Sequence, residues 1–365
     1  RSSNEQLNQI WDTSVYTFHL NTREFIFDGI KRDRWVWSGD SYQSFLMNYY
    51  SFFDQDVVKR TLIALRGKDP VHAHINTILD YSLYWFISMY DYYVHTADKE
   101  FIESQYDNMV SLMKFCLDRR NEKGMMEGIE ADWVFVDWAD IDNKGEVSTI
   151  QILLYKSLDS LGKLAKVIGK EEESEYYLEL AEELQLRIKE YFWVEDKGGF
   201  VHRRLDGQLD EKVTKYPNMF AVLYDTLDDA DRLKVKKQVL LNDDVQKITT
   251  PYMRFFELAA LCEVNEQEKV LDEILDYWGG MLDLGATSFW EAYDPRQKDA
   301  EHYEMYGIPY GKSLCHAWGA SPIYLLGKYF LGVKPLSPGY ETFIVEPQLG
   351  GLEWMEGTMP VADGE

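Results

Sequence analysis

The segment from 27 to 40 contains three carboxylates, three cationic side chains and two tryptophans. No hydrophobic period of 2 or 3.6 runs through it, and glycines interrupt it, so we expect a long ordered loop. Aromatic faces beside carboxylates suit a sugar, because its C–H groups stack on rings and its hydroxyls bond to acids. A charged surface loop pinned by its tryptophans is the simpler alternative. We favour a site, since such loops seldom lack a role. The acids are Asp28, Asp33 and Asp40, and the tryptophans are Trp35 and Trp37.

The cationic side chains of this loop decide which protonation state its acids adopt. Lys31, Arg32 and Arg34 lie between the aspartates and would keep most of them ionised. An acid buried against Trp35 or Trp37 would instead have its pKa raised, which a general acid requires. The loop can therefore hold both forms of a carboxyl group.

Two further segments combine acids with tryptophan. Residues 131–138 contain two Asp-Trp pairs five residues apart, at Asp132-Trp133 and Asp137-Trp138. A short buried connector whose aspartates cap helices explains them as well as a site does, because Asp is a common cap. Residues 285–291 run through small and apolar residues to Trp290 and Glu291. This approach favours a partly buried Glu291, which is a candidate general base, although an exposed glutamate would fit the spacing too.

The segment 313–322 places His316 between Cys315 and Ala317 at the expected start of the last helix. A lone histidine there is more often a satisfied core residue than a ligand, but a position near a helix N-terminus also allows bonding to a sugar hydroxyl. The chain has no Gly-rich phosphate loop and no nucleophile elbow. His72 and His74 have the wrong spacing for one helix face, so we expect no metal.

Composition bounds the partners of the chain. The 365 residues carry a formal net charge of −25, which would repel nucleic acid and anionic membranes. Aromatic residues make up 15% of the chain, a load that suits a broad core or a carbohydrate cleft. No apolar run reaches the roughly 20 residues of a membrane span. Three distant cysteines leave the compartment open. For a longer parent protein we favour the periplasm or the exterior, while a cytoplasmic location stays open.

The body of the chain reads as about a dozen helices joined by alternately short and long connections. Their uneven pairs fit a closed barrel of helical hairpins better than an open repeat scaffold, because no tight 34- or 40-residue repeat is visible. In such a barrel, loops gather at one rim and build a cleft. The expected helices cover 4–18, 41–66 with a break near Asp54, 76–95, 98–120, 147–168, 171–192, 217–225, 228–241, 251–263, 266–280 and 312–331.

Strand signal is weak until residue 340. Residues 340–345 read as one strand and 352–355 as a second. We expect a helical barrel domain over 1–335 and the start of a truncated C-terminal β-sandwich over 336–365.

Five segments together resemble the catalytic domain of bacterial α-L-rhamnosidases, glycoside hydrolases of family 78. They occur in the family's order and cover nearly the whole chain. The resemblance implies an (α/α)6 barrel, an inverting mechanism without cofactor, and further β-sandwich domains in the parent chain. The segments are IFDGIKRDRWVWSGD, the two Asp-Trp pairs, TPYMRFFELAAL, GATSFWE and SLCHAWGASP.

The resemblance also implies roles for individual residues. The family's general acid falls on Asp33, where Glu is usual, and its general base falls on Glu291. For inversion the two carboxyl groups should stand roughly 6.5–9.5 Å apart. The implied sugar-binding residues are Asp28, Arg32, Trp37, Asp40, Trp133, Asp137, Trp138, Trp290 and His316.

We therefore expect an exo-acting enzyme that releases terminal α-L-rhamnose from a glycoside or polysaccharide. Three alternatives stay open. A helical-barrel glycosidase for another sugar, such as a uronic acid, would carry extra Arg or Lys at the subsite. A catalytically silent carbohydrate-binding barrel would explain Asp33 in place of Glu. A helical protein-interaction scaffold would show an exposed apolar groove and no convergent carboxylates.

Overall fold

The computed structural model describes residues 1–361, and most of them are helical. The chain forms two compact units. Unit 1 consists of Arg1–Thr61, Val94–Ala97 and the chain from Thr249 onward, and unit 2 consists of Leu62–Tyr93 and Asp98–Ile248. No helix of the described residues is long and apolar enough to cross a membrane.

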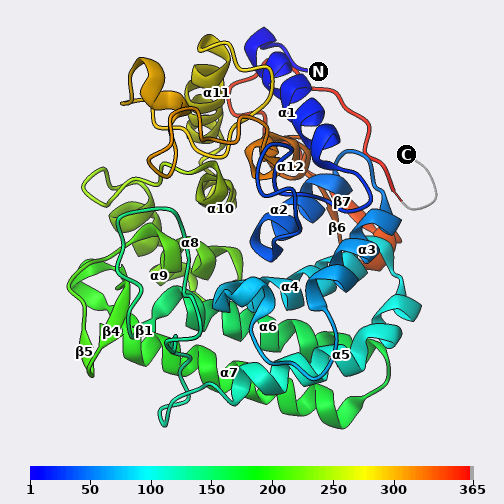
Figure 1. Ribbon diagram of the computed structural model, residues 1–365, viewed down its shortest axis with the longest axis vertical. Coiled ribbons are helices and arrows are strands. Elements are labelled where there is room, and N and C mark those ends of the chain that lie inside the picture. Colours follow the sequence, from blue (N-terminus) through cyan, green and yellow to red (C-terminus); the bar gives the residue numbers. More distant parts are fainter. Residues whose placement is uncertain (362–365) are drawn as a thin grey trace. The chain divides into compact units, whose positions relative to one another are not determined.

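Unit 1 contains the first helices and the last third of the chain (Figure 1). Helix α1 lies beside α11 and α12, and the hairpin of β6 and β7 follows α12. The elements are α1 (Glu5–Asn21), α2 (Ser38–Tyr49), the start of α3 (Gln55–Arg66), α10 (Pro251–Glu263), α11 (Gln267–Asp283), α12 (Pro322–Leu325), β6 (Val333–Pro335) and β7 (Phe343–Val345), with short 3₁₀ turns at Asp299–Tyr303, Ala317–Ala320 and Pro338–Tyr340 and a π turn at Leu326–Phe330.

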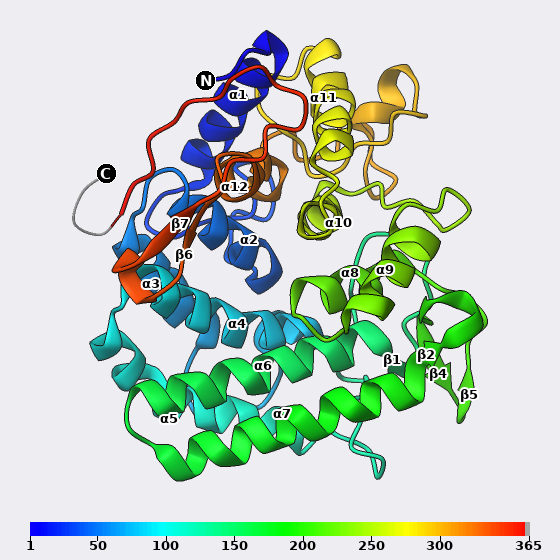
Figure 2. The same ribbon diagram turned by 180° about the vertical axis from the view of Figure 1, so that it is seen from behind.

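Unit 2 is built around a long helical hairpin. Figure 2 shows α6 and α7 side by side and antiparallel. Its short strands pair as two small antiparallel sheets, β1-β4-β5 and β2-β3. The elements are the end of α3, most of α4 (Leu79–Thr96), α5 (Lys99–Leu117), α6 (Ser148–Val167), α7 (Glu171–Phe192), α8 (Lys215–Leu223), α9 (Asp229–Val235), β1 (Glu146–Val147), β2 (Trp193–Val194), β3 (Gly199–Phe200), β4 (Arg203–Leu205) and β5 (Gln208–Leu209), with 3₁₀ turns at Ile75–Thr77 and Glu195–Lys197 and a π turn at Lys236–Leu240.

Local sequence explains where the helices start. Asn4 accepts a hydrogen bond from the backbone N–H of Leu7 at 2.9 Å and caps α1. Thr250 caps α10 in the same way, and Pro251 at the first helical position has no N–H that would need a partner. Most predicted helices are therefore confirmed, including the break near Asp54, which separates α2 from α3.

Three expectations about local structure were wrong. The predicted loop 28–40 ends at Trp37, because Ser38-Gly39-Asp40 forms the first turn of α2. The predicted helix 312–331 begins only after His316, since residues 313–316 are non-helical and bond to neighbouring segments. The predicted strand 352–355 is reduced to a single bridge between Met355 and Ser2. The first predicted strand survives as β7, paired with β6.

The short strands β1 to β5 were missed, because two or three residues carry no readable alternation. The β-sandwich predicted over 336–365 stays a prediction, and its last four residues lie outside the described residues.

Candidate active site

Three segments of unit 1 are joined through their backbones and form the floor of the candidate site. The N–H of Ala317 donates to the carbonyl of Asp28 at 2.7 Å, and Gly29 bridges to His316. The N–H of His316 donates to the carbonyl of Phe289 at 2.9 Å, and the N–H of Glu291 donates to that of Ser313 at 2.9 Å. These bonds fix Asp28, Glu291 and His316 relative to one another, although the sequence separates them by up to 288 positions.

Two buried carboxyl groups and one imidazole form the core of the site. His316 Nε2 lies 3.0 Å from Asp40 Oδ1, in the first turn of α2. Asp28 is 4% exposed and accepts the backbone N–H of Trp35 at 3.0 Å. Burial, with the charge of Asp40, raises the pKa of Asp28 to about 7, and burial also raises the pKa of Asp40.

The histidine experiences opposing effects. Burial lowers the pKa of His316, but the hydrogen bond to Asp40 and the charges of Glu291, Asp40 and Asp28 outweigh it, so the net pKa is raised. Its ring lies against Trp318, with 4.4 Å between ring centres. The imidazole is thus held in place and favours its protonated form among acids.

Glu291 is almost fully buried, and its carboxylate is bound by a guanidinium, a backbone N–H and a hydroxyl. Its carboxylate pairs with the guanidinium of Arg32. The backbone N–H of Ser313 donates to Oε2 at 3.2 Å, and the hydroxyl of Tyr306 donates to Oε1 at 3.3 Å. The ring of Tyr306 in turn lies under the guanidinium of Arg32, 4.3 Å from its centre. Both oxygens of the carboxylate thus have donors in the folded protein.

Asp33 lies next to Arg32 on the exposed part of the loop. Its negative charge acts on Tyr306, as the charge of Glu291 does. Tyr306 thus bonds to Glu291 and feels the charge of Asp33 more weakly. Trp35, two residues on, is 56% exposed.

The two predicted sugar-binding tryptophans of unit 1 differ in environment. Trp37 is half-buried just before α2. Trp290 is buried, and its ring lies 5.7 Å from the ring of Tyr303 and 6.1 Å from that of Tyr293.

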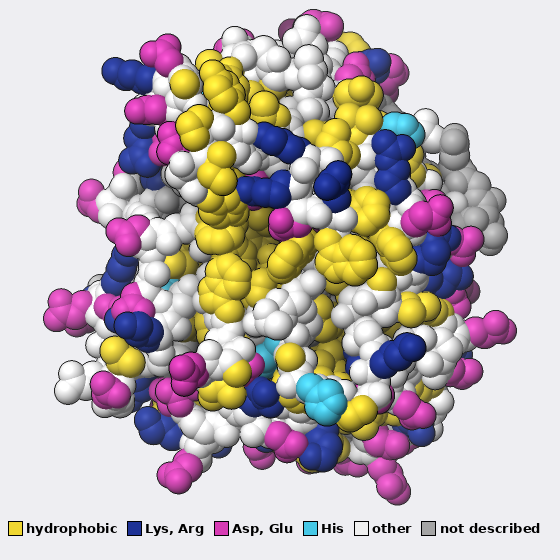
Figure 3. Space-filling view, viewed as in Figure 1, with side chains coloured by type: hydrophobic (Ala, Val, Ile, Leu, Met, Phe, Trp, Pro, Cys, Tyr) yellow, Lys and Arg dark blue, Asp and Glu magenta, His cyan; other side chains and the backbone are white. Residues whose placement is uncertain are grey.

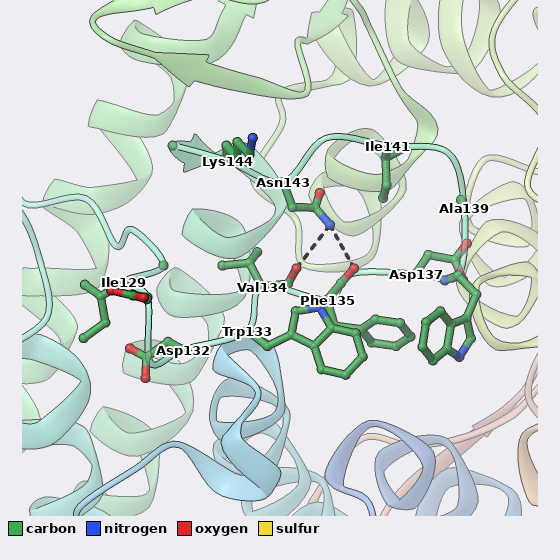
Figure 4. A pocket seen from close by; sticks show the side chains of 14 residues that line it. Ile129, Asp132, Trp133, Val134, Phe135, Asp137, Ala139, Ile141, Asn143 and Lys144 are labelled. Carbon is green, nitrogen blue, oxygen red and sulfur yellow. Dashed lines mark hydrogen bonds between the residues drawn. The ribbon is translucent and has the colours of Figure 1, made fainter. Parts of the chain in front are cut away.

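The Asp-Trp pairs belong to unit 2 and line a pocket of about 590 Å³ (Figure 4). Trp133 and Trp138 are both partly exposed, and their ring centres lie 5.6 Å apart, with Phe135 against each. Asn143 holds the segment by donating to the carbonyls of Val134 and Phe135. The pocket thus presents exposed tryptophan rings.

The aspartates of these pairs face the protein. Asp137 accepts a hydrogen bond from the hydroxyl of Tyr216 at 2.7 Å, and Asp132 accepts one from Arg119 Nε at 3.0 Å. Asp132 also lies 3.6 Å from the buried His74. Both carboxylates therefore have protein partners that hold the Asp-Trp segment in place.

Sequence reasoning missed three side chains or backbone groups at the site. Tyr306 and Lys312 lie beside Glu291, and the N–H of Ser313 bonds to it. Lys312 stands directly before the recognised SLCHAWGASP segment, and a lone lysine there could have been noticed. Nothing in the sequence around Tyr306 distinguishes it from the other tyrosines.

A mainly helical chain with converging buried carboxylates has the architecture of a helical glycosidase domain. Residues 1–330 match the model of the bacterial alpha-L-rhamnosidase 6 hairpin glycosidase domain. The chain belongs to this family, and the predicted all-α, six-hairpin (α/α)6 fold class is confirmed.

Solved structures and a curated relative agree with this family. The chain is 27% identical to a family 78 rhamnosidase of Bacillus sp. GL1, with a TM-score of 0.88. This match covers 100% of the present chain and 39% of the rhamnosidase. A rhamnosidase from Klebsiella oxytoca with rhamnose bound is 25% identical, with a TM-score of 0.74, over 90% of this chain and 64% of that one. The curated alpha-L-rhamnosidase of Alteromonas sp. (strain LOR) is 21% identical over 100% of this chain and 41% of the relative. The chain thus spans about two fifths of that curated relative.

Proposed function

We propose that this chain is the catalytic domain of an inverting glycoside hydrolase that releases terminal α-L-rhamnose. The observation that carries the proposal is the convergence of Asp28, Asp40, His316 and Glu291 on one backbone-paired floor in a chain of this family. Rhamnose is the sugar named for the similar proteins, and we extend it to this chain. The parent would act on a rhamnosylated glycoside or polysaccharide and carry additional β-sandwich domains.

In the proposed mechanism Glu291 is the general base. Arg32, Tyr306 and the N–H of Ser313 bind its carboxylate and fix its position. The anion would remove a proton from a water molecule that attacks the anomeric carbon from the face opposite the leaving group. Attack on that face inverts the configuration, so an α-L-rhamnoside yields β-L-rhamnose.

Asp33 would be the general acid that protonates the departing oxygen. Its carboxyl group is exposed in the absence of substrate. A bound leaving group would cover it, and loss of water favours the neutral form of a carboxyl group. The short Asp side chain in place of the family's Glu requires that the glycosidic oxygen lie close to the loop.

The remaining predicted residues would hold the sugar. Asp28, Asp40 and His316 can accept from and donate to its hydroxyls, while the half-buried Trp37 can stack on its C–H face. L-Rhamnose has a methyl group where other hexoses have a hydroxymethyl, so an aromatic surface beside it is expected. Trp290, Trp133, Asp137 and Trp138 stay predicted sugar-binding residues.

The test is hydrolysis of an aryl α-L-rhamnoside by the full-length protein, with the product anomer followed by NMR. We expect β-L-rhamnose to appear first, and Asp33→Asn and Glu291→Gln each to reduce kcat by at least about 100-fold, the usual contribution of a general acid or base. Matched controls are Asp56→Asn and Glu172→Gln, which alter exposed acids in the first turns of α3 and α7.

Each outcome has a definite meaning. First appearance of the α-anomer would contradict inversion. Full activity of Asp33→Asn would move the acid role to another residue. If the folded wild-type protein cleaves a uronide but no rhamnoside, the sugar assignment fails while the hydrolase assignment stands.

A further inference from the structure

Lys312 is a buried cation at the candidate site to which the proposed mechanism gives no role. Only 2% of the residue is exposed. Its Nζ lies 6.0 Å from the centre of the Trp290 ring. None of the described side chains forms a hydrogen bond or an ion pair with this ammonium group.

The backbone of Lys312 is fixed on both sides, so its side chain is held at Glu291. Its N–H donates to the carbonyl of Tyr303 at 3.1 Å, and its carbonyl accepts from Lys31 Nζ at 3.1 Å. The next N–H, of Ser313, binds the carboxylate of Glu291.

A mostly buried ammonium group without a hydrogen-bond or ion-pair partner is energetically unfavourable, because burial removes much of its hydration. The nearby acids do not relieve this cost by direct pairing. Glu291 pairs with Arg32, and Asp294 pairs with Arg296 at 2.7 Å. Such uncompensated groups concentrate at functional sites, where the ligand supplies the missing partner.

We propose that Lys312 is a substrate-binding residue whose ammonium group donates hydrogen bonds to hydroxyl oxygens of the bound sugar beside Glu291. This inference rests on the proposed function and adds a residue to its site. An ammonium group has three donors, and a sugar ring offers hydroxyls at neighbouring carbons as acceptors. Binding would then give the cation the partners that it lacks in the free protein.

The charge of Lys312 gives the inference a pH signature. Burial lowers its pKa to about 8, against the raising effect of Glu291 and Asp294. Lys31 and Tyr303 lie on segments bonded to its backbone, and Arg32 pairs with the neighbouring Glu291. Below pH 8 the ammonium group is charged and binds the sugar, and above pH 8 it loses a proton and affinity falls.

The experiment measures the Kd of L-rhamnose by calorimetry, kcat and KM for an aryl α-L-rhamnoside, and the melting temperature. It compares the full-length wild-type protein with Lys312→Met, which keeps the length of the side chain without its charge. Lys312→Arg keeps the charge up to pH 9. Lys328→Met is the matched control, because that partly buried lysine of unit 1 has protein partners, the hydroxyl of Tyr324 at 2.8 Å and Glu263 at 3.9 Å.

We expect Lys312→Met to raise the Kd of L-rhamnose roughly 10- to 100-fold at pH 7, the usual effect of one charged hydrogen bond. Its melting temperature should stay the same or rise, because an unpaired buried charge has been removed. Wild-type affinity should fall between pH 7 and 9, whereas that of Lys312→Arg should change less. Lys328→Met should leave Kd unchanged.

Three results for Lys312→Met would overturn the inference. The first is an unchanged Kd and an unchanged kcat. The second is a fall in kcat with an unchanged Kd, which would mean that Lys312 acts through Glu291 alone. The third is a loss of several degrees in melting temperature, which would mean a structural role. Failure of the proposed function looks different, since wild-type protein would then neither bind nor cleave a rhamnoside.

Discussion

At the scale of single residues, the site concentrates acids that would normally repel one another. Asp28 and Asp40 are both buried, and His316 bonds to the second of them. The pKa values of His316 and of both aspartates are raised. The cluster therefore keeps protons that the same groups would release if they were exposed to solvent. Polar groups of this kind suit a sugar, because protonated and ionised forms offer both donors and acceptors to hydroxyls.

The proton on Asp28 makes stability depend on pH. Its folded-state pKa of about 7 lies above the roughly 3.9 of an unfolded chain, so its contribution to stability is complete below pH 4 and is lost as pH rises through 7. Asp28→Asn removes this loss and can still accept the N–H of Trp35. We expect the variant to be more stable than the wild type at pH 8 by roughly 1–3 kcal/mol, with the difference shrinking toward pH 4.

Chemical denaturation at several pH values measures this difference. Asp56→Asn, at an exposed position of the same unit, should show no pH-dependent difference. A gap between Asp28→Asn and the wild type that stays constant from pH 4 to 8 would contradict the raised pKa.

At the scale of elements, the floor of the site depends on close backbone approach at Gly29. A Cβ there would lie 2.6 Å from Ser313 Oγ and 3.0 Å from His316 Nδ1. We expect Gly29→Ala to force the paired segments apart, to destabilise the protein by about 1–3 kcal/mol and to lower activity in larger proportion than folding. Thermal unfolding and kcat/KM measure the two effects.

The short distance between the new Cβ at position 29 and Ser313 Oγ offers an internal control. Ser313→Ala removes the hydroxyl that the new methyl group would meet, so the double variant Gly29→Ala/Ser313→Ala should recover part of the lost stability. If the losses of the two single variants simply add, the approach at Gly29 is not what fixes the segments.

The same segments mark the limit of what the sequence predicts. Helices such as α7 follow from amphipathic spacing within the element, and the predicted bounds of α7 match the structure. The non-helical course of residues 313–316 depends instead on partners at 28 and 289, far away in sequence. Local periodicity contains no signal for such pairing, so it was read as helix. The acids Asp28, Asp40 and Glu291 were identified by motif, whereas the contact of Tyr306 with Glu291 depends on folding alone.

At the scale of the whole chain, the groups of the candidate site sit within a strongly acidic protein. The sequence carries 63 acidic against 38 basic residues. Figure 3 shows acidic and basic side chains distributed widely over one face, with several Lys and Arg side chains beside hydrophobic ones in the upper half of the view. An excess of like charge keeps a protein soluble but disfavours its compact state through self-repulsion.

This excess predicts how stability responds to salt. The screening length falls from about 30 Å at 0.01 M to about 8 Å at 0.15 M ionic strength, so repulsion between distant carboxylates is largely removed while ion pairs in contact lose less. With a net charge of −25, repulsion should outweigh attraction. We expect the melting temperature at pH 7 to rise by a few degrees over this range of NaCl, and less at pH 5, where part of the carboxylates are protonated. A fall at pH 7 would mean that attractive pairs such as Lys189 with Asp231 dominate the electrostatics of the fold.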